Sequence, residues 1–164
     1  MILRPKPAHI HRNLILTGVF FISVLTGACS EPHTDILILH TLKGESIDLR
    51  AKRDRSLVIN YWAAWCKPCR TEIPELNALQ TQLADKVHVI GVNYDNPPLD
   101  RLRQESKQFD ITFDVVTADP AALLGYARPT VLPTTMIINP QGQISATLVG
   151  PQTVESIQAA LGSH

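Results

Sequence analysis

The sequence predicts an α/β fold with a central mixed β-sheet flanked by helices. Short apolar runs rich in β-branched and aromatic residues alternate with stretches whose apolar residues recur at helical spacing. Residues 57–62 (LVINYW) are apolar on both faces, which is typical of a central strand. Near the C-terminus, residues 134–139 and 143–149 flank Pro140-Gln141-Gly142, a hairpin signal that adds antiparallel pairing to a strand–helix–strand order.

The individual elements follow in order along the chain. Residues 36–39 and 46–49 flank Lys43-Gly44-Glu45 and predict an N-terminal β-hairpin. After the strand at 57–62, apolar residues at helical spacing predict a helix from about 67 to 84. The remaining expected elements are a buried strand at 87–93, a helix at 99–108, a short strand at 113–116, a short helix at 119–125, the two hairpin strands at 134–139 and 143–149, and a helix at 152–161.

Composition and charge exclude several classes of protein. A chain of 164 residues that is 45% hydrophobic and 18% charged is one ordinary domain, neither a disordered polyelectrolyte nor a membrane bundle. Three of the 15 basic residues precede residue 29, whereas all 15 acidic residues follow it. Residues 29–164 are therefore mildly acidic, and we expect no nucleic-acid partner, because such binding needs a basic face.

The first 35 residues have the composition of an export signal followed by a short tether. Residues 1–12 carry basic and no acidic side chains, and residues 14–28 are uncharged and mostly apolar but short of the roughly 20 residues that span a membrane. Leu25-Thr26-Gly27-Ala28-Cys29 resembles a bacterial lipobox, with Thr26 where Leu is usual. We therefore predict a signal peptide at 1–28, a tether at 29–35 lipidated on Cys29, and a folded domain at 36–164.

An uncleaved N-terminal anchor with an incidental Cys29 is the alternative to lipidation. Both interpretations place the domain outside the cytoplasmic membrane, where disulfides persist. Ser30 stands where enteric bacteria use Asp to retain lipoproteins in the inner membrane, which favours the outer membrane.

Cys66-Lys67-Pro68-Cys69 follows a buried strand and opens a helix. Two cysteines at this spacing on a first helical turn are close enough to form a disulfide. The N–H groups and macrodipole of a helix N-terminus stabilise a thiolate, the form that attacks disulfides. We expect Cys66, at the strand–helix junction, to be the nucleophile and the more buried Cys69 to resolve the mixed disulfide. Pro68 has no backbone N–H, which costs little here, because the N–H groups of a first helical turn have no partner within the helix.

Two other interpretations of the cysteine pair are weaker. Half of a zinc site would need a second pair of ligands, and neither a fourth cysteine nor suitably spaced histidines follow. A purely structural disulfide that closes so short a loop would stabilise the fold little. The pattern therefore favours redox activity, with no metal and no cofactor beyond the redox-active disulfide.

Residues 60–74, from Asn60 to Pro74, resemble the active-site segment of the TlpA/ResA-like thiol-disulfide oxidoreductases of bacterial envelopes, which have a thioredoxin-like fold. Residues 132–139 (LPTTMIIN) resemble the family's second signature. The resemblance implies that Pro133 is cis and lies against the cysteines, with Leu132 before it, where the backbone binds the substrate chain. Taken alone, Pro133 would be an ordinary strand-start proline. The resemblance also makes 94–125 the family's central strand–helix insertion.

Several side chains near the cysteines have expected roles. Glu72 matches a family glutamate near the thiols and is our candidate for the base that deprotonates Cys69, against the alternative of an ordinary acid near a helix N-terminus. Asn60 stands where cytoplasmic thioredoxins carry a titratable Asp. Lys67 is expected to be exposed, and Trp65 to lie on the active-site surface. The predicted substrate-binding residues are Trp65, Lys67, Pro68, Leu132 and Pro133.

The predicted function is that of a membrane-anchored periplasmic thiol-disulfide oxidoreductase. The resemblance implies a reductase of protein disulfides, for example in cytochrome c maturation, re-reduced by a membrane electron donor of the thiol-reducing type. Two alternatives stay open. The thiolates suit Cu(I), so the chain would be a copper carrier if His40 or His88 joined them. A peroxiredoxin-like peroxidase would need Pro and Thr shortly before an activated cysteine, and residues 58–65 contain neither.

Overall fold

The computed structural model describes residues 37–49 and 54–162. The predicted signal peptide, the tether and the lipidated Cys29 lie outside these residues and stay predictions. In the described part of the chain, no helix combines the length and apolar character needed to cross a membrane.

The central sheet contains five strands in the order β5-β4-β3-β6-β7. Strand β3 (Ser56–Trp62) lies in the middle, parallel to β4 (Val87–Asn93) and antiparallel to β6 (Thr134–Ile138). The outer strands are β5 (Asp114–Val115), parallel to β4, and β7 (Ile144–Val149), antiparallel to β6. The prediction that the strand ending at Trp62 is central is confirmed, and both of its faces are buried, as its apolar run requires.

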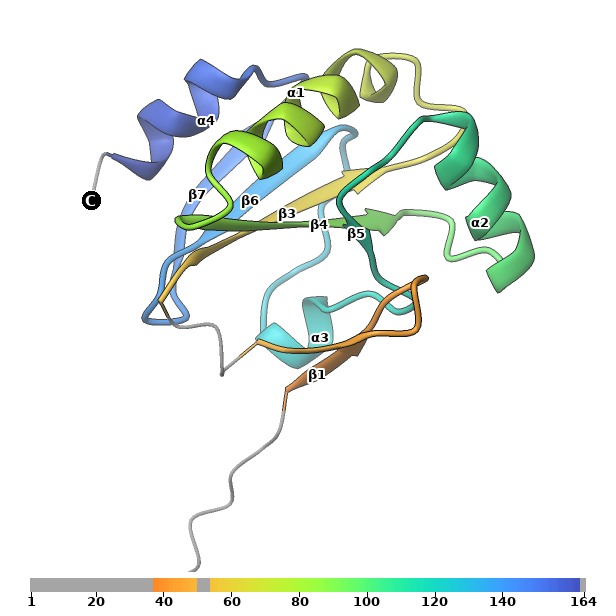
Figure 1. Cartoon of the computed structure of the whole chain (residues 1–164), viewed down its shortest axis with the longest axis horizontal. Coiled ribbons are helices and arrows are strands. Elements are labelled where there is room, and N and C mark those ends of the chain that lie inside the picture. Colours follow the sequence, from red (N-terminus) through yellow and green to blue (C-terminus); the bar gives the residue numbers. More distant parts are fainter. Residues whose placement is uncertain (1–36, 50–53, 163–164) are drawn as a thin grey trace, which may run out of the picture. The chain divides into compact units, whose positions relative to one another are not determined.

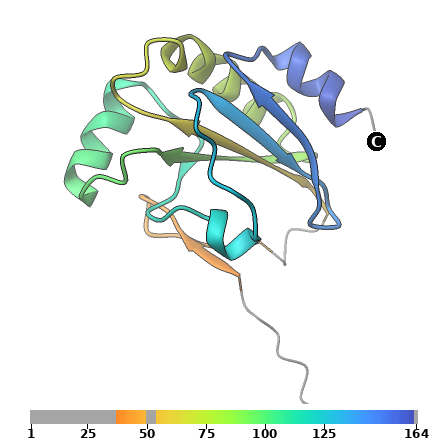
Figure 2. The same cartoon turned by 180° about the vertical axis from the view of Figure 1, so that it is seen from behind.

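Figures 1 and 2 show that the two faces of the sheet are covered differently. Helices α1 (Cys69–Gln82), α2 (Leu99–Gln108) and α4 (Val154–Leu161) pack with β3 and β4 in one apolar cluster. The second cluster joins the sheet to the hairpin formed by β1 (Ile38–His40) and β2 (Ser46–Asp48), with the four-residue α3 (Ala121–Leu124) beside it.

Helices flank both faces of the sheet, as predicted, but the two faces carry different amounts of helix. The second face carries mainly the hairpin, because Leu39 and Ile47 are buried against Ile59, Tyr61 and Met136 and leave room for only a short helix. The thioredoxin-like α/β architecture, with its five-stranded mixed sheet and N-terminal hairpin, is as predicted.

Helix α1 begins two residues later than predicted. It starts at Cys69 with Pro68 in the N-cap position, and it continues past Pro74 to Gln82. Cys66 lies instead in the preceding turn, where its N–H donates to the Ala63 carbonyl oxygen at 3.0 Å. The prediction that both cysteines lie on the first helical turn is therefore wrong for Cys66, because the backbone of Cys66 belongs to the non-helical turn between β3 and α1.

Candidate active site

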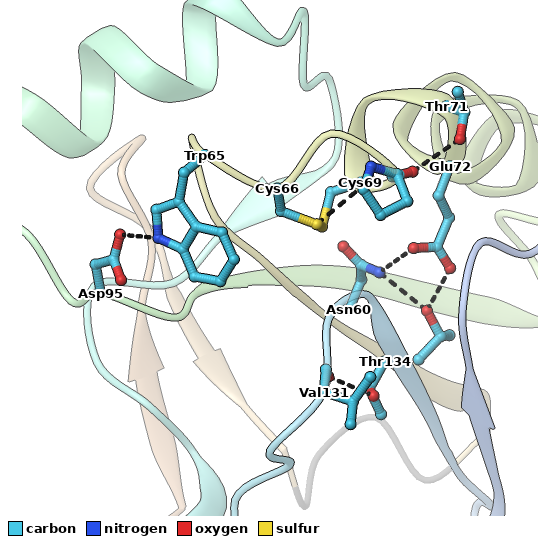
Figure 3. The surroundings of a disulfide bond; sticks show 11 residues. Asn60, Trp65, Cys66, Cys69, Thr71, Glu72, Asp95, Val131 and Thr134 are labelled. Atoms are coloured by element: carbon cyan, nitrogen blue, oxygen red, sulfur yellow. Dashed lines mark hydrogen bonds between the residues drawn. A yellow bond between two sulfur atoms is a disulfide. The ribbon is translucent and has the colours of Figure 1, made fainter.

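Cys66 and Cys69 are joined by a disulfide, with their Cα atoms 5.4 Å apart. The backbone N–H of Cys69, the first residue of α1, donates to Cys66 Sγ at 3.3 Å (Figure 3). Cys66 is 3% exposed and Cys69 is fully buried. A helix N-terminal N–H directed at a sulfur stabilises its thiolate, so Cys66 has the environment of a nucleophile although it lies just outside the helix.

Glu72 lies one helical turn after Cys69 and is fully buried. Its Oε1 accepts a hydrogen bond from the Thr135 hydroxyl at 2.8 Å, and its Oε2 accepts one from Asn60 Nδ2 at 2.8 Å. Burial raises the pKa of Glu72 from 4.5 to about 7, although these two hydrogen bonds act in the opposite direction. A carboxyl group that titrates near neutral pH can both take and return a proton at physiological pH.

Asn60 stands where cytoplasmic thioredoxins carry an Asp, and Thr135 lies in the second signature, but the sequence did not indicate that both are partners of Glu72. They are direct partners across β3 and β6, and Asn60 Nδ2 also donates to Thr135 Oγ1 at 2.9 Å. A further sequence signal is that both are polar residues within strands that are otherwise buried. Buried polar side chains are nearly always hydrogen-bonded, so such residues indicate a network even when their partners are unknown.

The peptide bond between Leu132 and Pro133 is cis, as the family resemblance implies. Because β6 is antiparallel to β3 and pairs Thr134 with Tyr61, the start of β6 lies at the end of β3 that leads to the cysteines. Pro133 is buried and its carbonyl oxygen accepts a hydrogen bond from Gly150 N at 2.9 Å. Leu132 is half-buried, and Val131 before it is exposed. The fold thus brings the predicted substrate-binding loop to the disulfide.

The remaining predicted substrate-binding residues lie on the surface. Trp65 is 65% exposed, and Lys67 and Pro68 are also exposed. The Trp65 indole N–H donates to Asp95 Oδ2 at 2.9 Å, which fixes the ring beside the cysteines (Figure 3). Asp95 follows β4 and was not anticipated, because the contact joins positions 30 residues apart.

Arg128 connects the Asp95 segment to the loop that leads to Pro133. Its guanidinium lies 4.0 Å from the centre of the Tyr94 ring and donates to the Tyr94 carbonyl oxygen. Its Nε donates to Asp119 Oδ2 at 2.7 Å. One arginine thus holds the loop before the cis-proline against Tyr94, the residue that precedes Asp95, so these two segments share one support.

Replacing Arg128 with Met should loosen this support. We expect a several-fold higher KM for a protein disulfide with little change in kcat, and a loss of about 1 kcal/mol of unfolding free energy, because the partly exposed ion pair and cation–π contact are lost. Steady-state kinetics and urea unfolding measure both. Arg103→Met is the matched control, since Arg103 forms an exposed ion pair with Asp100 within α2. Equal effects of the two substitutions would contradict the role of Arg128.

The two histidines that the structure describes, His40 and His88, do not join the cysteines. His88 is the second residue of β4 and pairs with Leu57, at the far end of β3 from Cys66, and its Nε2 lies 2.9 Å from Asp114 Oδ2. His40 on β1 contacts the Ser46 hydroxyl through Nδ1 at 3.1 Å. Within residues 37–49 and 54–162, no group of three or more His, Cys, Asp or Glu side chains is placed to hold a metal ion.

Comparison with known proteins agrees with this geometry. The AhpC/TSA family matches residues 33–147. The chain is 32% identical to the thioredoxin-like protein YneN of Bacillus subtilis, over 75% of this chain and 73% of that protein. It is 31% identical to the thiol-disulfide oxidoreductase ResA of Geobacillus kaustophilus, over 77% of this chain and 72% of ResA.

Among solved structures, a DsbF homologue from Corynebacterium diphtheriae superposes with a TM-score of 0.65 at 27% identity, covering 76% of this chain and 82% of that one. A disulfide at the end of the central strand, a cis-proline beside it and these similarities lead to one conclusion. The chain belongs to the AhpC/TSA family and, within it, to the ResA-like thiol-disulfide oxidoreductases.

Proposed function

We propose that this thiol-disulfide oxidoreductase reduces disulfides of protein substrates in the bacterial periplasm. The observation that carries the proposal is the Cys69 N–H directed at Cys66 Sγ beside the cis-Pro133 loop, which suits Cys66 to attack a bound substrate disulfide. The proline in Cys-x-Pro-Cys supports the reducing direction, because it is shared with the reducing members that the sequence resembles.

The reaction begins with the reduced dithiol. The Cys66 thiolate attacks one sulfur of the substrate disulfide, whose S–S bond breaks and releases the other sulfur as a thiolate. Glu72 takes the proton of Cys69, and the Cys69 thiolate attacks Cys66 Sγ. The bond between Cys66 and the substrate breaks, and the second substrate sulfur leaves as a thiolate. The substrate gains two electrons and the protein holds the Cys66–Cys69 disulfide.

Substrate binding is assigned to the surface around the disulfide. Leu132 and Pro133 offer the backbone to an extended substrate segment, while Trp65, Lys67 and Pro68 contact its side chains. Trp65 is the largest apolar side chain of this group. Because Asp95 already holds its ring, the side chain loses little conformational entropy when a substrate binds. Apocytochrome c with an oxidised haem-binding cysteine pair is the substrate that the ResA-like resemblance favours.

The cycle requires a membrane partner. A donor of the thiol-reducing type must return two electrons to Cys66–Cys69, and lipidation of Cys29 would hold the domain at a membrane surface. The basic and apolar composition of residues 1–28, followed by the lipobox-like Leu25–Cys29, supports this location, and Ser30 favours the outer membrane.

A redox titration tests the direction of electron flow. The full chain in detergent, with Cys29→Ser to leave only two thiols, is equilibrated in dithiothreitol and glutathione buffers and followed by thiol trapping and by the emission of Trp62 and Trp65. We expect a reversible two-electron transition below about −220 mV, as a reductase needs. A potential near −120 mV would make the protein an oxidant. Failure to form a Cys66–Cys69 disulfide would contradict the proposal altogether.

A further inference from the structure

Glu105 is a buried carboxylate that the reaction described above does not use. It lies on α2, a helix with mostly exposed side chains, yet only 6% of Glu105 is exposed. Burying an ionised carboxylate is unfavourable unless the group is paired and hydrogen-bonded. The partners of Glu105 therefore indicate why an acidic residue stands at this position.

The two oxygens of Glu105 have separate partners. Oε1 accepts from Arg101 Nε at 2.6 Å, one helical turn earlier, and the Arg101 side chain is 61% exposed. Oε2 accepts from Asn93 Nδ2 at 2.8 Å. Asn93 is buried and is the last residue of β4, beside which α2 lies (Figure 1). The arginine offsets the buried charge, and the second oxygen connects α2 to the end of the sheet.

The Asn93 amide can face Glu105 in only one direction. Its Oδ1 accepts from the backbone N–H of Asp95 at 2.9 Å, which is the pattern of an Asx turn. The Asn93 carbonyl oxygen also accepts from Asn96 N at 3.1 Å in the same turn. Because a backbone N–H can only donate, Oδ1 must face Asp95 and Nδ2 must face away from it. Nδ2 then needs a buried acceptor, and Glu105 Oε2 is that acceptor.

This turn carries the carboxylate that holds Trp65. Asp95 Oδ2 accepts from the Trp65 indole N–H at 2.9 Å (Figure 3), and Trp65 directly precedes Cys66. The Trp65 side chain is mostly in solvent, so packing constrains it little. The direction of the Asp95 carboxylate, and therefore the shape of the turn after β4, largely sets where the ring lies beside the disulfide.

We propose that Glu105 is a positioning residue for substrate binding. It holds the Asn93 amide, the amide holds the turn that carries Asp95, and Asp95 holds Trp65. This inference rests on the proposed function, in which Trp65 contacts the substrate. Glu105 acts only through these residues, so its loss should weaken substrate binding and leave the exchange chemistry of the cysteines intact.

A role confined to α2 makes a different prediction. The ion pair between Glu105 and Arg101 joins positions four residues apart on one helix, and such pairs stabilise the helix itself. Arg101→Met removes the ion pair and leaves the hydrogen bond to Asn93. Glu105→Gln also removes the ion pair, but its amide oxygen can still accept from Asn93 Nδ2. Glu105→Leu removes both interactions.

The position of Trp65 is measured first, without substrate. The chain has two tryptophans, so the NMR spectrum of the isotope-labelled protein contains two indole N–H signals. Trp65→Phe identifies the Trp65 signal. Trp62 is fully buried, and its indole N–H has no hydrogen-bond partner among the described residues, so its signal is the internal reference. In the full chain carrying Cys29→Ser, Glu105→Leu should shift the Trp65 signal toward that of a solvated indole and speed its exchange with solvent.

Steady-state kinetics then tests the consequence for binding. Insulin is the protein disulfide, and dithiothreitol re-reduces the enzyme. Glu105→Leu should raise KM roughly fivefold with little change in kcat, because substrate binding must then order a side chain that the native chain already holds. Glu105→Gln should restore the native KM and the native Trp65 signal.

Arg101→Met is the matched control and should leave both the Trp65 signal and KM unchanged. If Glu105→Leu unfolds the protein, Asn93→Ala replaces it, because it breaks the same connection one residue closer to Asp95. An unmoved Trp65 signal, a moved signal with an unchanged KM, or equal effects of Arg101→Met and Glu105→Leu would overturn the inference. A native chain that reduces no protein disulfide would instead contradict the proposed function, and the NMR measurement does not depend on that result.

Discussion

Cys66→Ser is expected to abolish disulfide exchange, whereas Cys69→Ser should trap the substrate. The serine alcohol introduced by Cys66→Ser cannot attack a disulfide, so the rate should fall by roughly 10³-fold or more, to the background rate. In Cys69→Ser the Cys66 thiolate still attacks, but the resolving sulfur is missing. A covalent mixed disulfide with the protein substrate should therefore accumulate, visible as a band that disappears on adding dithiothreitol.

Both cysteines are buried, so the role of nucleophile is assigned to Cys66 from the N–H at the start of α1 that donates to its Sγ. This pair of variants tests that assignment. The comparison is made in the Cys29→Ser background, so that the third cysteine cannot form the adduct. If Cys66→Ser traps substrate and Cys69→Ser does not, then Cys69 is the attacking residue and the roles are exchanged.

Glu72→Gln is expected to stabilise the oxidised protein at alkaline pH while slowing catalysis. The pKa of Glu72 is 4.5 in a solvated chain and about 7 in the folded protein. Between these values the folded state holds a proton that the unfolded state has lost, so the contribution of Glu72 to stability is fully present below pH 4.5 and decreases as pH rises through 7. The difference between these two pKa values corresponds to about 3 kcal/mol at pH 8.

The amide introduced by Glu72→Gln is neutral at every pH and avoids this cost. Urea unfolding should therefore show a variant more stable than the native chain by up to about 3 kcal/mol at pH 8, with the difference vanishing near pH 4. Loss of the base should slow release of the mixed disulfide by roughly 10²-fold near neutral pH.

Glu75→Gln is the control for this prediction, because Glu75 lies on the same helix but accepts from the backbone of α4. It should produce no gain in stability at pH 8 and no slowing of release. A native chain whose stability is flat between pH 5 and 8 would show that Glu72 does not titrate in this window.

The elements of the fold were largely predictable because their signals are local. The strand at 87–93 and the helix at 99–108 were predicted with the observed bounds, since uninterrupted apolar runs and helical periodicity mark them clearly. The start of α1 was placed too early, because residues 63–68 form a turn that periodicity does not reveal. The sequence did not predict that the hairpin packs on the second face, because which element covers a sheet depends on long-range contacts.

The chemical site divides in the same way. Cys66, Cys69 and Glu72 share one segment, so their spacing and their place at a strand–helix junction are visible in sequence. Thr135, Asp95 and Arg128 act through partners that are 63, 30 and 34 residues away. Nothing in their local sequence indicates these partners.

By itself, the sequence determined the class of fold, the position of the central strand and the identity of the redox pair, because these follow from periodicity and from a four-residue motif. Only the tertiary structure decided which polar side chains come together around Glu72, close to the pair. The register of β3 against β6 places Thr135 opposite Asn60, and packing of α1 on that sheet brings Glu72 to both. Burial in this contact raises the pKa of Glu72 toward neutrality, and burial is a property of the folded chain rather than of any local segment.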